Sequence, residues 1–492
     1  MTSSHQTRSG PSVTTLMLAL LSACLAFQLN ASMLSPALVS IERQLNVTAG
    51  AVANTQSAFF IAAAMFALFL PRLADIVGRR RVLCAALMIM TVGCVISALA
   101  TNIQMLFVGR IIQGASGPVI PIALVMLRVE VPEPKKYGTL LGVVTAVNGG
   151  IAGFDALLGG YLVTNHGFHS IFWTMGAVAV IAAILVRIMT RESFGADRRR
   201  LDISGTVLLV LAVGAALIAI NETGKLGNAN WWIATGTAVF AVVAFTLFWM
   251  VEERIPAPLV PVSQMRQRST WALISTTALA LGGVFAMMNG IVPALAQDDA
   301  LGFRLDAETT SALTLTPYAI AGLLMGPLSG RLAASFGYKS ILRLGLIGTV
   351  VGMTALAFGV HSNEPAFLFI VAICVGITYA GMANIMLNGL GVVLSPPERP
   401  GSLPGLNTGA FNIGAGLSFV VIYAIQAAAT TDPAMPAAGY IAAVIGSVLM
   451  LAGAFAMSFV IPRPTSAEAT APRPETAKAA QPVHNSPGAS PT

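Results

Sequence analysis

Two charged residues lie inside long apolar segments of this sequence, and they are the residues best placed to do chemistry. Arg110 stands in the segment LFVGRIIQG, and Asp155 stands in a later apolar segment that is rich in glycine. A charge in the hydrocarbon core of a bilayer costs about 3 kcal/mol or more, so such a residue normally faces a cavity and has a partner. An arginine and a carboxylate in this setting can form an ion pair, and the carboxylate can also bind and release a proton.

The two charges are expected at similar depths. Counted from the predicted ends of their segments at about 1.5 Å per helical residue, Arg110 lies about 7 to 8 Å and Asp155 about 12 Å below the outer surface. We therefore hypothesise that Asp155 is the charge partner of Arg110 and the group that titrates. Two alternatives stay open: an ion pair that is only structural, and an arginine whose long side chain extends to the outer interface.

The composition places the chain in a membrane. Of the 492 residues, 56% are hydrophobic and 10% are charged, and the mean hydropathy is +0.79, whereas a soluble domain has roughly 25% charged residues. The net charge of +7 does not indicate nucleic-acid binding, because the cations form short clusters between apolar segments without interleaved aromatic residues. The four cysteines lie in apolar segments without CxxC spacing, so no metal site is expected.

The segments that position the two charges are long enough to cross a bilayer. Fourteen of them have about 20 residues, the length that spans a hydrocarbon layer of about 30 Å. They lie near residues 13–33, 52–70, 82–100, 105–127, 138–163, 168–189, 203–221, 231–251, 271–295, 309–330, 341–360, 365–394, 404–428 and 437–461. With both termini in the cytoplasm, 23 of the 27 Lys and Arg fall on the inner side, as the positive-inside rule requires, and this supports an even number of spans.

A short repeat divides these spans into two halves. The stretch Arg72–Ala74 and the following Gly78 recur 259 residues later as Arg331–Ala333 and Gly337. The two copies follow the second and the tenth span, so the halves are displaced by eight helices and two extra helices separate two six-helix bundles. We expect a cytoplasmic tail (1–12), an N-terminal bundle (13–189), two intervening helices (203–251), a C-terminal bundle (271–461) and a disordered cytoplasmic tail (463–492).

The loop after the second span resembles the first signature of the major facilitator superfamily, Gly-x-x-x-Asp-x-x-Gly-Arg-Arg/Lys. The matching residues are Asp75, Gly78, Arg79 and Arg80, and Pro71 replaces the first glycine. The resemblance covers about residues 13–461 and is to the fourteen-helix drug–proton antiporter branch. It implies that the acid latches the two bundles on the cytoplasmic side, with a partner near Leu403 and Pro404. The alternative is that the cations of this loop only orient the protein.

Two other signatures are matched in part. Arg110 and Gln113 fit the family pattern Arg-x-x-Gln-Gly, and the resemblance implies that Arg110 takes part in proton coupling while Gln113 fixes its surroundings. In the fifth span, residues 155–160 read DALLGG where the antiporters have Gly-Pro-x-x-Gly-Gly. The first span carries Asn30 where relatives of this branch carry an acid. These departures weaken the expectation of proton coupling more than the expectation of transport.

Neutral polar residues inside the spans are the expected lining of a central cavity. Each of them has an alternative role as an interhelical hydrogen-bonding residue, a common packing device in membranes. The cavity candidates are Asn30, Asn54, Gln56, Gln113, Asn148, Asn289, Asn384, Asn388, Asn407 and Asn412. An apolar cavity with few polar anchors suits an amphiphilic organic solute.

The sequence therefore predicts an all-α, multi-pass secondary transporter of the inner or plasma membrane that works by alternating access. Its expected activity, implied by the resemblance, is proton-coupled, multidrug-type efflux of hydrophobic or amphiphilic compounds. The alternatives are an uncoupled facilitator or metabolite exporter, and a non-transporting sensor or scaffold. An enzyme is not expected, because the chain has no phosphate-binding loop and no nucleophile–base constellation. The expected partners are a small-molecule substrate, protons and the lipid bilayer. No cofactor is expected besides a proton gradient, and the sequence does not indicate an oligomeric state.

Overall fold

The computed structural model describes residues 12–131, 133–195, 203–223, 229–255, 262–301, 303–360, 364–395, 402–430, 435 and 437–462. Within these ranges the chain consists of helices and the turns that join them. The predicted tails lie outside the described residues, apart from Ser12, and so does the side chain of Asn148. The all-α prediction is confirmed for the described part.

The first helices of the chain begin at polar caps. The Ser12 side chain accepts a hydrogen bond from the amide of Thr15, and Asn102 accepts one from the amide of Met105, as expected for residues that satisfy the free amides of a helix start. The elements of this part are α1 (Val13–Ser32), η1 (Ser35–Ala37), α2 (Leu38–Leu45), α3 (Ala49–Val77), α4 (Arg79–Ala98), α5 (Ile103–Gln113), η2 (Gly114–Ser116), α6 (Val119–Glu130), α7 (Pro134–His166) and α8 (His169–Met189).

Three of the later helices change to π-helix for one or two turns. A π-helical stretch inserts an extra residue into a helix and is frequent at functional sites. The three stretches are η4, η5 and η6. The elements of this part are α9 (Ile203–Thr223), α10 (Trp231–Arg254), α11 (Val262–Met265), α12 (Arg268–Ala286), η4 (Met287–Ile291), α13 (Val292–Ala296), α14 (Ala307–Thr310), η5 (Ser311–Leu315), α15 (Thr316–Phe336), α16 (Tyr338–Gly359), α17 (Pro365–Val375), η6 (Gly376–Ala383), α18 (Asn384–Val393), α19 (Ser402–Ala429) and α20 (Ala437–Val460).

Twelve helices of the described residues are long and apolar enough to cross a membrane. Each of the twelve overlaps one of the predicted spans. The two remaining predicted spans, 138–163 and 203–221, also form helices, α7 and α9, but neither is among the twelve. The protein is therefore a multi-pass membrane protein, and the count of fourteen spans is not confirmed.

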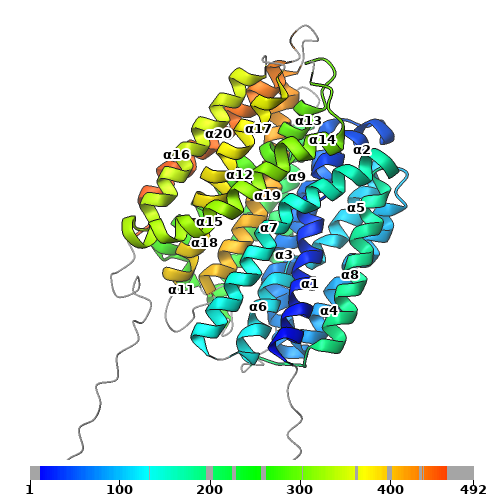
Figure 1. Cartoon of the computed structure of the whole chain (residues 1–492). Coiled ribbons are helices and arrows are strands. Elements are labelled where there is room, and N and C mark those ends of the chain that lie inside the picture. Colours follow the sequence, from blue (N-terminus) through cyan, green and yellow to red (C-terminus); the bar gives the residue numbers. More distant parts are fainter. Residues whose placement is uncertain are drawn as a thin grey trace, which may run out of the picture.

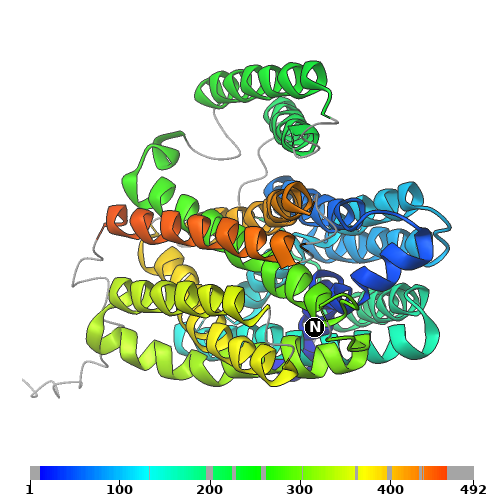
Figure 2. The same cartoon turned by 90° about the horizontal axis from the view of Figure 1, so that it is seen from above.

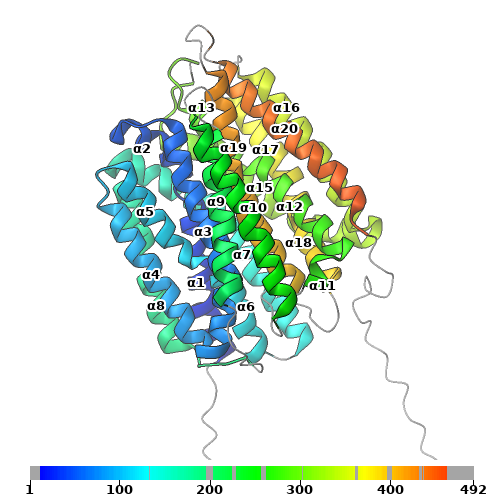
Figure 3. The ribbon, with the colours of Figure 1, turned by 180° about the vertical axis from the view of Figure 1, so that it is seen from behind.

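The helices gather in two groups. Helices α1 to α8 lie on one side of the molecule and α12 to α20 on the other (Figure 1). Helices α9 and α10 pack against each other at the edge, where α9 touches both α3 and α19 (Figures 2 and 3). This grouping follows the ranges 13–189, 203–251 and 271–461, whose division into bundles remains a prediction.

The two groups meet along a seam. Helix α3 packs on α19, and α7 packs on α14 and α15. At the second contact Thr316 Oγ1 donates a hydrogen bond to the backbone oxygen of Gly153 at 2.9 Å. Helices α2 and α13 lie at one end of the molecule, opposite the starting end of α1 (Figure 1). We call the end with α2 and α13 the outer end, following the positive-inside prediction.

Candidate functional site

Arg110 is fully buried, and neutral groups hold it. Its Nη1 donates to Oε1 of Gln113 at 2.7 Å and to the backbone oxygen of Asn30 at 3.2 Å. Its Nη2 donates to the same backbone oxygen at 3.3 Å and to Oε1 of Gln56. The guanidinium carbon lies 4.2 Å from the centroid of the Phe59 ring. Charge-assisted hydrogen bonds and the ring face together stabilise a cation that has no contact with water.

The backbone of α1 supplies part of the negative charge that Arg110 needs. Helix α1 ends at Ser32, so the carbonyl of Asn30 is one of the last four of the helix, which lack an intrahelical donor. These carbonyls carry the partial negative charge of the helix C-terminus, which favours a nearby cation. The end of α1 thus takes the place that a carboxylate would otherwise fill.

A further set of contacts fixes the groups around Arg110. Gln113 donates from Nε2 to Oγ of Ser97 at 2.8 Å, which joins α5 to α4. Helices α4 and α5 approach closely at Gly93 and Gly109, where an added Cβ atom would overlap the other helix. Four helices, α1, α3, α4 and α5, therefore position this arginine, and Gln113 hydrogen-bonds to both Arg110 and Ser97.

Asp155 on α7 is also buried, and its contact is with α1. Its Oδ2 lies 2.5 Å from Oγ of Ser32, and its Oδ1 has no hydrogen-bond partner among the described residues. Oγ of Ser32 lies 3.0 Å from the backbone oxygen of Gln28 and accepts from Nε2 of Gln28 at 2.8 Å. A hydroxyl has one proton to donate. Ser32 donates it either to Asp155 or to Gln28, and in the second case a protonated Asp155 donates to Ser32.

The predicted ion pair between Arg110 and Asp155 does not hold in this conformation. Within the described part of the chain, no salt bridge joins the two residues. Arg110 contacts the backbone of α1 at Asn30, whereas Asp155 contacts the side chain of Ser32, two residues further on. Both groups therefore act on the end of α1, but each has its own partner.

The cytoplasmic latch predicted for Asp75 is not formed in this conformation either. Asp75, in the last turn of α3, pairs through Oδ1 with Arg79 at the start of α4, 2.7 Å from Nη2 and 2.8 Å from Nε. Among the described residues, no hydrogen bond or salt bridge joins the Asp75 carboxylate to the start of α19 near Leu403 and Pro404. Gly78 has a φ of +120°, a conformation that favours glycine, so the glycine of the signature stands where the backbone between α3 and α4 requires one.

Glu192, three residues after the end of α8, contacts the start of α4 and was not among the predicted site residues. Its Oε1 accepts from the amide of Arg80 at 2.9 Å, at the N-terminus of α4, and its Oε2 lies 3.7 Å from Nε of Arg80 and 3.6 Å from Nε of Arg81. A carboxylate at a helix N-terminus is favoured by the helix dipole. The only sequence signal was an acid among the cations that follow the sixth predicted span.

The predicted cavity amides fall into separate places. Asn30, Gln56 and Gln113 surround Arg110, as described above. Asn407 accepts from Oγ1 of Thr277 at 2.6 Å, and its Nδ2 lies 3.4 Å from Oδ1 of Asn388. Asn388 is exposed and bonds within its helix to the backbone oxygen of Asn384 at 3.0 Å. Asn412 is buried, and its Nδ2 has no partner among the described residues, while Asn54 is half-buried.

Several polar contacts join the two groups of helices at the outer end. Ser35 on η1 donates to Oδ1 of Asn289 on η4 at 3.2 Å. Gln297 donates from Nε2 to the backbone oxygen of Pro36 at 3.3 Å. Arg43 and Asp299 form a salt bridge of 3.2 Å. These contacts close the seam at the outer end in this conformation.

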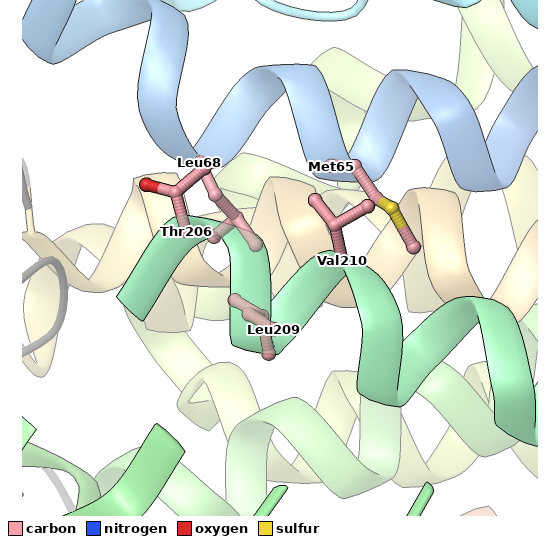
Figure 4. A pocket seen from close by; sticks show the side chains of 5 residues that line it. All are labelled: Met65, Leu68, Thr206, Leu209 and Val210. Carbon is pink, nitrogen blue, oxygen red and sulfur yellow. The ribbon is translucent and has the colours of Figure 1, made fainter. Parts of the chain in front are cut away.

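An apolar groove lies between α3 and α9, outside the seam. Met65 and Leu68 line it from α3, and Thr206, Leu209 and Val210 line it from α9 (Figure 4). It has no charged residue in its lining. The Thr206 side chain is the one polar residue in this lining, whereas a binding site for a polar solute has several placed polar groups.

Two groups of membrane-spanning helices that meet around buried polar residues form the architecture of a secondary transporter. The chain belongs to the Major Facilitator Superfamily, whose model matches residues 20–419. Transport, rather than enzymatic catalysis, is the activity of this family of proteins, and the predicted superfamily is thereby confirmed.

Comparison with known proteins gives relatives of more than one kind. The chain is 50% identical over 455 residues to the "Uridine/deoxyuridine transporter" of Lactococcus lactis subsp. cremoris (strain MG1363), covering 92% of this chain and 95% of that protein. It is 26% identical over 414 residues to the "Multidrug resistance protein Stp" of Mycobacterium tuberculosis (strain ATCC 25618 / H37Rv), covering 82% and 75%.

Solved structures share the fold. The chain matches the crystal structure of the nucleoside transporter NupG with a TM-score of 0.60 and 14% identity, covering 90% of this chain and 99% of that one. It matches the D-xylose-proton symporter with a TM-score of 0.62 and 13% identity, covering 92% and 99%. At 14% and 13% identity, these two matches show a shared fold and nothing about the substrate.

Proposed function

We propose that this protein transports pyrimidine nucleosides of the uridine and deoxyuridine type across the plasma membrane by alternating access. The observation that carries the proposal is the 50% identity, over 92% of the chain, to the relative named as a uridine/deoxyuridine transporter. The chain covers 95% of that relative, so the similarity includes both groups of helices and the seam between them.

The chemistry of the buried polar groups supports an uncharged polar solute. Ser35 and Asn289 meet across the seam, and α19, which packs on α3 there, carries the buried amides of Asn407 and Asn412, with the buried hydroxyl of Thr277 bonded to Asn407 from α12. These groups donate and accept hydrogen bonds without carrying charge. A nucleoside is neutral and presents hydroxyl groups, ring carbonyls and an imide, which such side chains match.

We further propose that protons drive this transport and that Asp155 is the coupling group. The contact between Asp155 and Ser32 accommodates two arrangements that differ by one proton, because the hydroxyl can donate to Asp155 or to Gln28. The same heavy-atom positions therefore suit the loaded and the unloaded acid. Both termini are proposed to lie in the cytoplasm, as the distribution of Lys and Arg favours.

The second candidate function is proton-coupled efflux of hydrophobic or amphiphilic compounds, as in the fourteen-helix antiporter branch. It is favoured by the signature at Arg110 and Gln113 and by the relative of 26% identity named as a multidrug resistance protein. An uncoupled facilitator is the remaining alternative, since Asn30 stands where antiporters of that branch carry an acid.

Counterflow in proteoliposomes distinguishes the nucleoside proposal from the efflux candidate. We expect vesicles loaded with unlabelled uridine to take up labelled uridine, and we expect external deoxyuridine to inhibit this uptake while ethidium leaves it unchanged. Vesicles without protein provide the control. Ethidium flux in the absence of uridine counterflow would contradict the nucleoside proposal and favour the efflux candidate.

A further inference from the structure

Three phenylalanine rings from three helices meet at the seam. Phe60 on α3, Phe285 on α12 and Phe419 on α19 form what we call the seam cluster. The ring of Phe60 lies 4.9 Å from that of Phe285, edge to face, and 6.4 Å from that of Phe419, nearly parallel at 10°. The rings of Phe285 and Phe419 lie 6.1 Å apart. Phe60 and Phe419 are fully buried, and Phe285 is half-buried.

The three rings lie at one depth. Each stands 17 residues from the inner end of its own helix, which corresponds to about 25 Å at 1.5 Å per residue. Phe60 belongs to the first group of helices, whereas Phe285 and Phe419 belong to the second. The seam cluster is therefore a contact between the two groups, in the outer half of the membrane.

Opening the outer end has to break this contact. If the two groups separate there, Phe60 loses its contact with the other two rings, and each such ring carries about 150–250 Å² of surface that prefers an apolar neighbour. A planar aromatic solute can replace the lost ring contact, since bases stack well on aromatic side chains. A sugar without a base offers no such face.

Unpartnered amide donors stand on the same helix faces as the rings. Gln56 lies one turn before Phe60, and its Nε2 is buried without a partner among the described residues. Asn412 lies seven residues before Phe419, and its Nδ2 is likewise buried without a hydrogen-bond partner among the described residues. Residues four or seven apart share a helix face. A buried donor without a partner calls for an explanation such as a ligand, and the ring carbonyls of a pyrimidine base are acceptors.

We propose that Phe60, Phe285 and Phe419 form the base-binding surface of the transport site, with the amides of Gln56 and Asn412 facing the base carbonyls. The inference rests on the proposed nucleoside function and deepens it, because it assigns recognition to the base rather than to the sugar. It also explains how one site accepts uridine and deoxyuridine, which differ only in the sugar.

The test uses the full-length protein in proteoliposomes and measures the KM and Vmax of uridine counterflow. We expect the wild-type protein to be inhibited by uracil and not by D-ribose. We expect Phe60→Leu and Phe419→Leu each to raise the KM for uridine about tenfold, the effect of losing one stacking face, with a Vmax close to wild type. Phe60→Tyr keeps the ring and should restore the wild-type KM.

Phe172→Leu is the matched control. Phe172 is a fully buried ring in contact with Phe168 at 6.4 Å within the first group of helices, away from the seam, so its KM should stay at the wild-type value. If Phe60→Leu does not reach the membrane, Phe285→Leu, at the half-buried ring, replaces it.

The failure of the inference differs from the failure of the proposed function. A wild-type KM in the leucine variants, or inhibition by D-ribose equal to that by uracil, overturns the base-binding surface while uridine transport stands. Absence of uridine counterflow in the wild-type protein overturns the proposed function itself.

Discussion

Replacing Arg110 by alanine is expected to reduce uridine transport by two orders of magnitude or more. The guanidinium satisfies Oε1 of Gln113, Oε1 of Gln56 and the backbone oxygen of Asn30. Each buried acceptor left without a donor costs about 1–3 kcal/mol, and the end of α1 loses the cation that its helix dipole favours. The change therefore displaces α1 relative to α3 and α5.

The measurement is uridine counterflow in proteoliposomes, with the amount of folded protein checked by size-exclusion chromatography. Arg128→Ala is the control, because Arg128 is exposed and stacks on the ring of Tyr137, 4.8 Å from its centroid, so its transport rate should stay near wild type. Arg110→Lys keeps the charge but lacks the fork of donors, and we expect it to recover only part of the rate. A wild-type rate in Arg110→Ala would contradict the role given to this residue.

Asp155→Asn is expected to abolish uphill accumulation of uridine while downhill counterflow continues. An asparagine can still accept a hydrogen bond from Ser32 through its amide oxygen, so the contact between α7 and α1 is kept. It cannot gain or lose a proton, so a pH gradient no longer drives transport. We expect the accumulation ratio to fall to its equilibrium value and the pH dependence of uptake to flatten.

Uptake under an imposed pH gradient, compared with counterflow without a gradient, separates these two effects. Asp155→Glu retains a titratable acid and should keep part of the accumulation, and Glu308→Gln, which changes an exposed acid at the outer end, serves as the control. Gradient-driven accumulation in Asp155→Asn would show that another group couples the proton. A wild-type protein that ignores the gradient would support the uncoupled facilitator.

The helices were predictable because their cause is local. Length and apolar content alone define a segment that crosses a bilayer, and each of the twelve spanning helices overlaps a predicted span. The count of fourteen depends on α7 and α9, which are helices but are not among the twelve.

The burial of Arg110 was predictable, but its partners were not. A cation inside an apolar segment must have a compensating group, and the sequence offers Asp155 as the obvious one. The structure instead uses the backbone oxygen of Asn30. Every residue carries a backbone carbonyl, so residue type gives no sign that this one is used. Its availability depends on where α1 ends.

Contacts between segments far apart in the chain could not be predicted from the sequence for a related reason. Glu192 lies 112 residues after Arg80, whose amide it caps, and nothing local links the two. The rings of the seam cluster belong to a chain with 23 phenylalanines, and their selection requires knowing that α3, α12 and α19 adjoin. Periodicity places such residues on a helix, whereas packing decides which helix they meet.

A disulfide across the outer end tests the central claim, that the two groups of helices separate there during each transport cycle. Oγ of Ser35 and Oδ1 of Asn289 are 3.2 Å apart, so the two side chains face each other across the seam, and cysteines at these positions are the pair to test for disulfide formation. Among the native cysteines, Cys24 and Cys94 are buried, and Cys84 and Cys374 are half-buried. The single variants Ser35→Cys and Asn289→Cys control for disulfides between an introduced and a native cysteine.

The measurement is uridine counterflow by the double variant Ser35→Cys, Asn289→Cys, before oxidation, after oxidation and after reduction with dithiothreitol. Our account predicts that oxidation abolishes counterflow, that reduction restores it, and that neither treatment changes the single variants. Complete crosslinking is checked by cleaving the chain between the two cysteines and running the fragments on a gel without reductant. If the fully crosslinked protein shows the same counterflow rate as the protein reduced with dithiothreitol, the account is contradicted.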